Sequence, residues 1–150
     1  MRTINTHIGI DPDTEKNGIA CYDSETKTFV YVTNMSFWQV IEEIESWLIP
    51  IHVVIEAGWL IKKSNWHNRA GQTKSTGEKI AKAVGRNHQV GILLYEYCLK
   101  NNIEVTLVKP KGKINKTTFK NITKWEKRTN QDSRDAGMLV FRTKNLKLNE

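Results

Sequence analysis

The chain of 150 residues contains 39% hydrophobic and 26% charged residues, which suits one globular domain with a buried core. No stretch reaches the roughly 18 apolar residues of a membrane span, and the first residues lack the apolar core of a signal peptide. The two cysteines form neither a zinc motif nor a disulfide framework. We therefore expect an intracellular, cytoplasmic protein with no membrane partner, in which Cys21 and Cys98 are buried free thiols.

The formal charge of +7 is divided unevenly along the chain. Residues 1–58 hold three Lys/Arg and nine Asp/Glu, a net charge of −6, whereas residues 59–150 have a net charge of +13. A basic surface beside an acidic pocket is what a metal-dependent enzyme acting on a polyanion requires. A generic solvated basic face is the alternative that charge alone leaves open.

The opening of the chain predicts three antiparallel strands. In residues 7–23, HIGIDPDTEKNGIACYD, an apolar strand ends at Asp11, and a second strand begins at Asn17 after a turn. Residues 28–32 form the third strand. Asp is depleted in strands, and burial of its charge is costly without a partner. We interpret Asp11 as a metal ligand.

A helix and a fourth strand follow. Ser36 is the expected N-cap of a helix over residues 37–49, which Pro50 terminates. Its two tryptophans, Trp38 and Trp47, are expected in the core. The apolar run IHVVIE is typical of a strand in a covered sheet, and it again ends in a carboxylate, Glu56.

Residues 58–75 are basic and aromatic, without clear periodicity. Aromatic side chains interleaved with cations are suited to stacking on bases while the cations hold phosphates. We expect Trp59 and Trp66 to stack in this way, and the alternative is a surface loop anchored by two tryptophans. The cations of this segment that we expect to contact DNA are Lys62, Lys63, Arg69 and Lys74.

Residues 76–101 predict one long helix, and residues 104–108 the fifth strand. Gly85 and Gly91 inside the helix cost about 1 kcal/mol each relative to Ala. We therefore expect them to permit the close approach of another element, either the sheet or a second subunit. The helix face over residues 85–97 is a candidate dimer interface.

Residues 109–120, KPKGKINKTTFK, form the densest cationic segment. A solvated charge run is one interpretation. However, the segment connects a strand to a helix predicted over residues 117–125, so it could present its lysines to phosphates. These lysines are Lys109, Lys111, Lys113, Lys116 and Lys120.

The last predicted helix runs from residue 132 to about residue 146. Asp132 and Asp135 are spaced i, i+3 and would share one helix face. With Asp11 and Glu56 they form four carboxylates at the ends of three elements, which suits divalent cations that prefer oxygen ligands. At 4 Å and an effective dielectric constant near 20, each ionised pair costs about 4 kcal/mol, so such a cluster needs cations or bound protons. Two metal ions about 3.5–4 Å apart could also activate water and stabilise a leaving oxygen, which would leave a nick with a 5′ phosphate.

Four segments together resemble the RuvC-type Holliday junction resolvases of the ribonuclease H-like superfamily. These are IGIDPDTEKNGIACYD, EAGW, VKPKGKINKTTF and QDSRDAGMLV. The resemblance implies an α/β fold in a single domain over residues 1–150, with a mixed five-stranded sheet, three antiparallel strands then two parallel, flanked by helices. Asp13 stands where that family usually has Gly, and the lysine-rich segment is shorter, which suggests a phage-encoded or otherwise divergent member.

The resemblance also implies a site and a substrate. Asp11, Glu56, Asp132 and Asp135 would bind two Mg²⁺ ions, with Mn²⁺ as a substitute, and Trp59 would stack at the junction centre. Lys113 and Lys116 match the pair of lysines that contacts phosphate in that family. The resemblance also implies that Lys116 is one of the catalytic residues.

The implied protein is a homodimer that nicks two symmetry-related strands of a four-way junction. Two alternatives remain open. One is a nuclease of the same superfamily that acts on flaps, other branched DNA or RNA–DNA hybrids. The other is a non-catalytic nucleic-acid-binding module.

Overall fold

A mixed five-stranded sheet forms the centre of the molecule. The computed structural model describes residues 2–61 and 74–149. The strand order is β4-β3-β2-β5-β6, in which β2, β3 and β4 are antiparallel, β5 is parallel to β2, and β6 is parallel to β5. The strands are β2 (Thr6–Asp11), β3 (Asn17–Asp23), β4 (Thr28–Met35), β5 (Ile51–Glu56) and β6 (Glu104–Val108). The predicted α/β class and the predicted sheet, three antiparallel strands and then two parallel, are confirmed.

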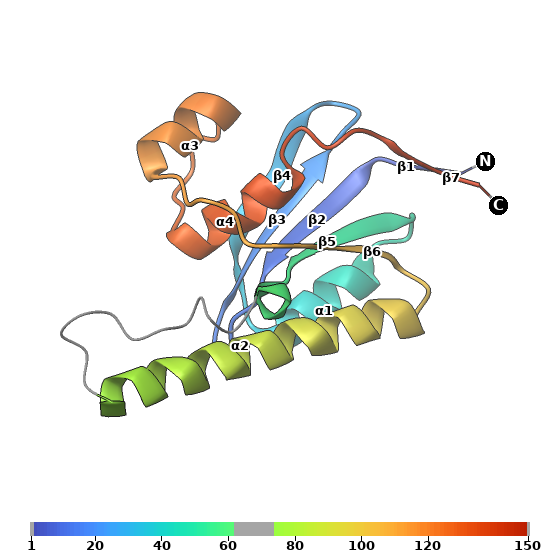
Figure 1. The fold of residues 1–150 in the computed structure, drawn as a ribbon. Coiled ribbons are helices and arrows are strands. Elements are labelled where there is room, and N and C mark those ends of the chain that lie inside the picture. The colour runs from blue at the N-terminus through green and yellow to red at the C-terminus, as the bar shows by residue number, and fades with distance from the viewer. Residues whose placement is uncertain (1, 62–73, 150) are drawn as a thin grey trace.

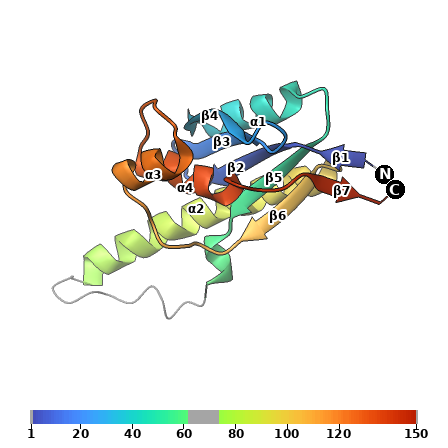
Figure 2. The same cartoon turned by 90° about the horizontal axis from the view of Figure 1, so that it is seen from above.

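Helices cover both faces of this sheet (Figures 1 and 2). Helices α1 (Phe37–Ser46) and α2 (Lys74–Lys100) lie on one face, and α3 (Lys116–Thr123) and α4 (Gln131–Val140) lie on the other. A short 3₁₀ helix, η1 (Gly58–Leu60), follows β5. None of the helices in the described ranges combines the length and the apolarity that crossing a bilayer requires.

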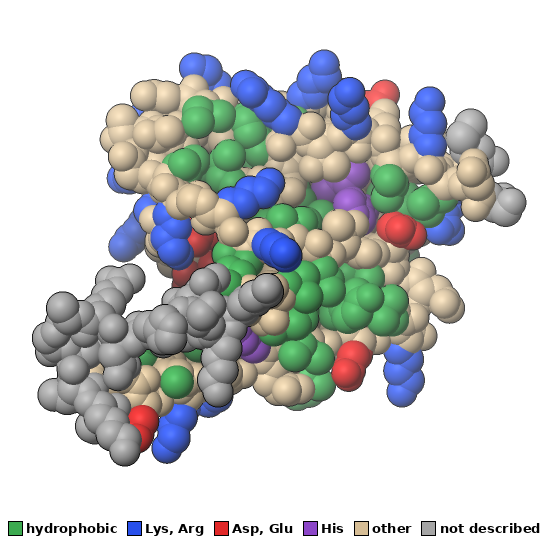
Figure 3. Space-filling model, in the orientation of Figure 1, with side chains coloured by type: hydrophobic (Ala, Val, Ile, Leu, Met, Phe, Trp, Pro, Cys, Tyr) green, Lys and Arg blue, Asp and Glu red, His purple; other side chains and the backbone are tan. Residues whose placement is uncertain are grey.

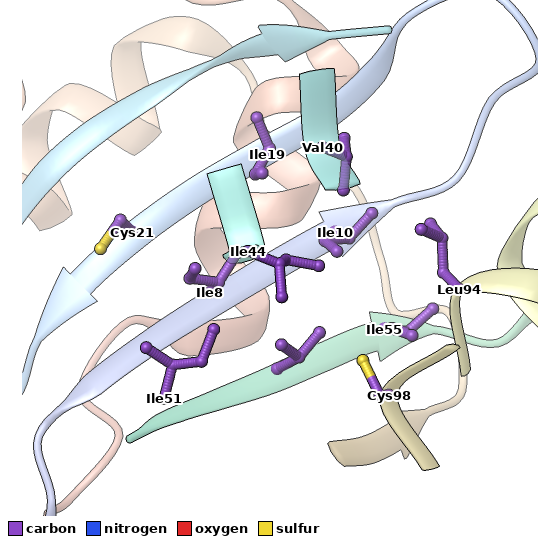
Figure 4. Close-up of a cluster of buried hydrophobic side chains, with 11 residues drawn as sticks. Ile8, Ile10, Ile19, Cys21, Val40, Ile44, Ile51, Ile55, Leu94 and Cys98 are labelled. Atoms are coloured by element: carbon purple, nitrogen blue, oxygen red, sulfur yellow. The ribbon is translucent and has the colours of Figure 1, made fainter. Parts of the chain in front are cut away.

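Apolar side chains from both layers fill the larger core cluster (Figure 4). Ile8 and Ile10 of β2 project from the sheet between Val40 of α1 and Leu94 of α2. Strands β2 and β5 have helices on both faces, which explains why their sequences are almost continuously apolar. Cys21 and Cys98 are free thiols buried in this same cluster, as predicted.

The C-terminal segment differs from its prediction. Helix α4 ends at Val140 and not near residue 146, because Arg142 adopts a left-handed backbone conformation with φ 65°. The chain then forms β7 (Leu146–Leu148), which pairs antiparallel with β1 (Arg2–Ile4). Neither three-residue strand has a pattern long enough to be recognised in the sequence.

The prediction that Trp38 belongs to the core is wrong, because 71% of this residue is exposed. Its neighbour Phe37 packs against the core instead. Trp47 does pack on the core, although α1 has already ended at Ser46, and its indole N–H donates to Glu43 at 2.9 Å.

The two glycines of α2 have different surroundings. A Cβ atom on Gly91 would lie 2.5 Å from the ring of Trp59 and 3.0 Å from Pro12, so the expected close approach is found there. A Cβ atom on Gly85 would meet nothing within 4 Å in the described part of the chain. The expectation that Gly85 permits the close approach of another element is therefore wrong within the described chain.

Candidate metal centre

Carboxylates from three elements meet at one edge of the sheet. Asp11 is the last residue of β2 and Glu56 is the last residue of β5. Because these strands are parallel neighbours, with Ile10 opposite Ile55, their carboxyl ends lie side by side. Helix α4 adds Asp135, and one carboxylate oxygen from each of the three residues lies within 4.8 Å of the other two.

Two strand glycines allow α4 to approach the sheet this closely. A side chain on Gly18 of β3 would overlap the backbone carbonyl of Asp132, and one on Gly9 of β2 would overlap that of Ala136. Gly18 also pairs with Asp11 across the β2–β3 ladder. Because these positions have no Cβ atom, the first turn of α4 has room to lie beside Asp11. A glycine inside a strand can signal such a backbone approach, but our sequence analysis did not use this signal.

The start of α4 is defined by a capping box. Asn130 accepts a hydrogen bond from the Ser133 N–H at 2.9 Å, and the Ser133 hydroxyl accepts one from the Asn130 N–H at 3.0 Å. Asp132 lies in the first turn, where the exposed N–H groups favour a negative charge. Asp135 follows on the same helix and accepts from Gln131 at 2.7 Å.

The cluster is electrostatically strained in the absence of a cation. Burial raises the pKa of Asp11, and the neighbouring carboxylates of Glu56, Asp132 and Asp135 raise it further. Burial and the charge of Asp13 also raise the pKa of Asp132, although its hydrogen bond with Asp11 acts in the opposite direction. The structure thus brings all four predicted carboxylates together, and adds Asp13 to the negative field around them.

Lys113 is in direct contact with the cluster. Its ammonium group donates to Oδ2 of Asp135 at 2.9 Å. This hydrogen bond raises the pKa of Lys113. Lys113 is one of the lysines predicted to contact phosphate, and its partner Asp135 belongs to the carboxylate cluster.

A hollow of about 340 Å³ lies beside the carboxylates. Asp11, Glu56 and Asp132 line it on one side, and Lys111 and Lys113 line it on another. The remaining wall comes from η1, α2 and two loops, through Pro12, Asp13, Gly58, Trp59, Val84, Asn87, His88 and Pro110.

Trp59 is half-buried in this wall. Its ring packs against Gly91 and lies 6.3 Å from the ring of His88. Our sequence analysis did not identify the contribution of α2 to the hollow, and helical periodicity alone contains no signal for it.

Three further lysines predicted to contact DNA do not line the hollow. They are Lys109, Lys116 and Lys120, all of them exposed, and Lys120 pairs with Glu126 at 3.1 Å. Lys116, which was also predicted to be catalytic, is the first residue of α3. Lys74 begins α2, but its side chain is outside the described part of the structure. The other predicted contacts, Lys62, Lys63, Trp66 and Arg69, lie outside the described residues.

The donor set fits a hard divalent cation. All three converging atoms are carboxylate oxygens, which Mg²⁺ and Mn²⁺ prefer, and none is a thiolate or imidazole. A bound cation would also relieve the repulsion that raises the pKa of Asp11.

No protein-family model matches the chain. A search of curated proteins also found no match.

Proposed function

We propose that this protein is a metal-dependent, structure-selective DNA endonuclease that resolves four-way junctions by paired nicks leaving 5′ phosphates. The observation that carries the proposal is the convergence of Asp11, Glu56 and Asp135 beside a hollow whose wall also holds Lys111 and Trp59. A metal site, a phosphate-binding cation and an aromatic surface thus adjoin one another. The resemblance of four sequence segments to the RuvC-type resolvases and the strand order of the sheet support the same function.

The carboxylates provide the metal-binding part of the site. Asp11, Glu56 and Asp135, with Asp132 beside them, would hold Mg²⁺ or Mn²⁺. When bound, divalent cations at such a site lower the pKa of a water nucleophile and stabilise the charge on the leaving oxygen of a phosphodiester.

The other residues of the hollow bind and orient the DNA. Lys111 and Lys113 hold the phosphates next to the scissile one, because both residues line the same hollow as Asp11, Glu56 and Asp132. Trp59 offers the uncovered part of its ring to a base at the distorted junction centre. Trp59 is held in place by Gly91 and His88, so the base meets a fixed surface.

Junction resolution needs two cuts, and a homodimer would supply them. Two copies related by a two-fold axis would present their carboxylate clusters to two symmetry-related strands of the junction. The face of α2 over residues 85–97 remains the candidate interface.

The acidic cluster argues against a binding module without catalysis. Four carboxylates repel phosphates, so a protein that only binds nucleic acid gains nothing from placing them beside Lys111 and Lys113. With a bound cation the same cluster attracts the scissile phosphate.

The decisive experiment compares the cleavage of a labelled four-way junction, a flap, a linear duplex and an RNA–DNA hybrid, each with Mg²⁺, Mn²⁺ or EDTA. Glu56→Gln removes one ligand, and Glu42→Gln on the exposed surface of α1 is the matched control. We expect metal-dependent paired nicks confined to the junction, lost in Glu56→Gln and retained in Glu42→Gln. Cleavage of flaps or hybrids instead would show that the protein is a nuclease with a different substrate. Tight junction binding without cleavage would identify a binding module.

A further inference from the structure

A second hollow, of about 620 Å³, lies at the opposite end of the central strand from the carboxylates. It is bounded by the turn between β3 and β4 and by the chain that leads from α4 to β7. Ser24 in its wall donates to the backbone carbonyl of Asn5, just before β2 begins, whereas Asp11 ends β2. At 3.3 Å per residue, the two ends of β2, Thr6 and Asp11, are roughly 17 Å apart, and this length approximates the separation of the two hollows.

The charged residues that line this second hollow are all basic. They are Lys27, Arg142, Lys144 and Lys147. The other lining residues are uncharged: Tyr22, Ser24, Thr143 and Asn145. Lys and Arg side chains gather along the upper edge of the molecule in Figure 3, over the β3–β4 hairpin and the chain after α4. We call this site the distal basic hollow.

These four cations are available to a ligand. Each is exposed, and the ion pairs found in the described ranges do not involve them. The carboxylates of the same β3–β4 turn have other partners. Asp23 accepts from the Glu25 N–H at 2.8 Å, and Glu25 accepts from the Asn5 amide at 3.2 Å.

Two of the four cations, Lys27 and Arg142, have a backbone conformation that other residue types adopt more readily. Lys27 and Arg142 have φ values of 60° and 65°, in the left-handed region that favours Gly and Asn. The guanidinium carbon of Arg142 lies 5.1 Å from the centroid of the Phe141 ring, which fixes its direction. Such local strain at charged residues motivates a functional explanation.

We propose that the distal basic hollow binds the sugar-phosphate backbone of a DNA arm whose junction end lies at the carboxylate cluster. The proposal rests on the function proposed above, because the arm belongs to the same substrate. Four exposed cations contributed by two chain segments suit a row of phosphates better than one small anion. The separation of the two hollows corresponds to about five base pairs at 3.4 Å per step.

The test measures how the affinity for DNA depends on salt. The dissociation constant of a four-way junction with arms of about 15 base pairs is measured in EDTA, from about 0.05 to 0.3 M salt. The double variant Arg142→Asn/Lys144→Gln should lower the slope of log affinity against log salt by about 2 and weaken binding roughly tenfold or more near 0.1 M salt. Asn tolerates the left-handed backbone at position 142, so the fold is retained. Lys144→Gln alone should lower the slope by about 1.

Two controls test the position of the contact. Lys100→Gln removes an exposed charge at the end of α2, outside both hollows, and should leave the slope unchanged. A junction with arms of about four base pairs closed by hairpin loops is too short to reach the distal basic hollow. The wild type and the double variant should bind this short junction equally.

Three results would overturn the inference. They are an unchanged slope in the double variant, an equal loss of affinity on the short junction, and a loss confined to a mononucleotide probe such as AMP. Metal-dependent junction cleavage with an unchanged slope would overturn this inference alone. If the double variant lowers the slope but the protein cleaves none of the DNA substrates, the proposed endonuclease function is wrong. The inference that the distal basic hollow binds DNA would then still hold.

Discussion

The ammonium group of Lys113 lies 2.9 Å from Oδ2 of Asp135, one of the three carboxylates that converge on the candidate metal position. The side chain of Lys113 is 66% exposed, whereas that of Asp135 is only 11% exposed. The lysine therefore extends from the surface to a nearly buried acid. It neutralises part of the cluster and competes with a metal ion for the carboxylate of Asp135.

Replacing Lys113 should strengthen metal binding. In Lys113→Gln, Asp135 no longer has a competing cation, and we expect Mn²⁺ affinity to rise about two- to fivefold, the range of a partly exposed ion pair. Isothermal titration calorimetry measures this directly. Lys120→Gln breaks the pair with Glu126 away from the site and should leave the affinity unchanged. Weaker Mn²⁺ binding in Lys113→Gln would show that this lysine does not compete with the metal.

Removing the charge of Asp11 should stabilise the metal-free protein while abolishing cleavage. Its pKa is higher in the folded state than in the unfolded chain, so the ionised group destabilises the fold, increasingly as the pH rises between these two pKa values. In EDTA at neutral pH, Asp11→Asn should raise the free energy of unfolding by about 1–2 kcal/mol. Chemical denaturation measures this, with Glu42→Gln as a neutral surface control. A variant that fails to fold would make Asp11 a structural residue.

The two glycines of α2 provide a matched pair of substitutions. In Gly91→Ala the new methyl group would displace the ring of Trp59 or Pro12 in the wall of the hollow. We expect weaker junction binding and a loss of up to about 2 kcal/mol of stability, since overpacking exceeds the gain in helix propensity.

Gly85→Ala has room for its methyl group within the described part of the chain and should instead gain about 1 kcal/mol of stability. Thermal unfolding and a gel-shift assay test both variants. Equal behaviour of the two alanines would show that the contact between Gly91 and Trp59 does not shape the site.

A buried hydrogen-bonded chain should make the stability depend on pH. His7 contacts Ser24 at 3.0 Å and His52 at 3.0 Å, and His52 contacts Thr106 at 2.8 Å. Burial and the neighbouring His52 lower the pKa of His7 to about 4. The unfolded chain therefore binds a proton near its ordinary pKa of 6.5 that the folded protein excludes, so this contribution to stability is lost as the pH falls from about 6.5 toward 4.

His7→Gln keeps a hydrogen-bonding side chain and removes this titration. Between about pH 7.5 and pH 5, the wild type should lose about 2 kcal/mol more stability than the variant. Denaturant titrations over this pH range measure the difference. Parallel curves for the two proteins would show that His7 does not titrate on unfolding.

Local patterns were sufficient for most of the elements. Apolar runs that end in a carboxylate predicted the strands that finish at Asp11 and Glu56, and the spacing of Asp132 and Asp135 predicted their shared position at the start of a helix. These features repeat over a few residues, so periodicity and turn residues specify them. The errors lie where no such repeat exists, at the end of α4 after Val140, in the exposure of Trp38 and in the surroundings of Gly85 within the described chain.

The tertiary structure alone decided which of these residues meet. The parallel pairing of β2 with β5 brings Asp11 to Glu56, and the bare backbone at Gly18 allows Asp132 to approach them. The ion pair between Lys113 and Asp135, the pairing of His7 with His52 and the distal basic hollow likewise join segments between 22 and 120 residues apart. Contacts of this kind depend on how two surfaces pack together. A sequence pattern reports the period and burial of one segment at a time, so it identified the four carboxylates but not the arrangement that brings them together.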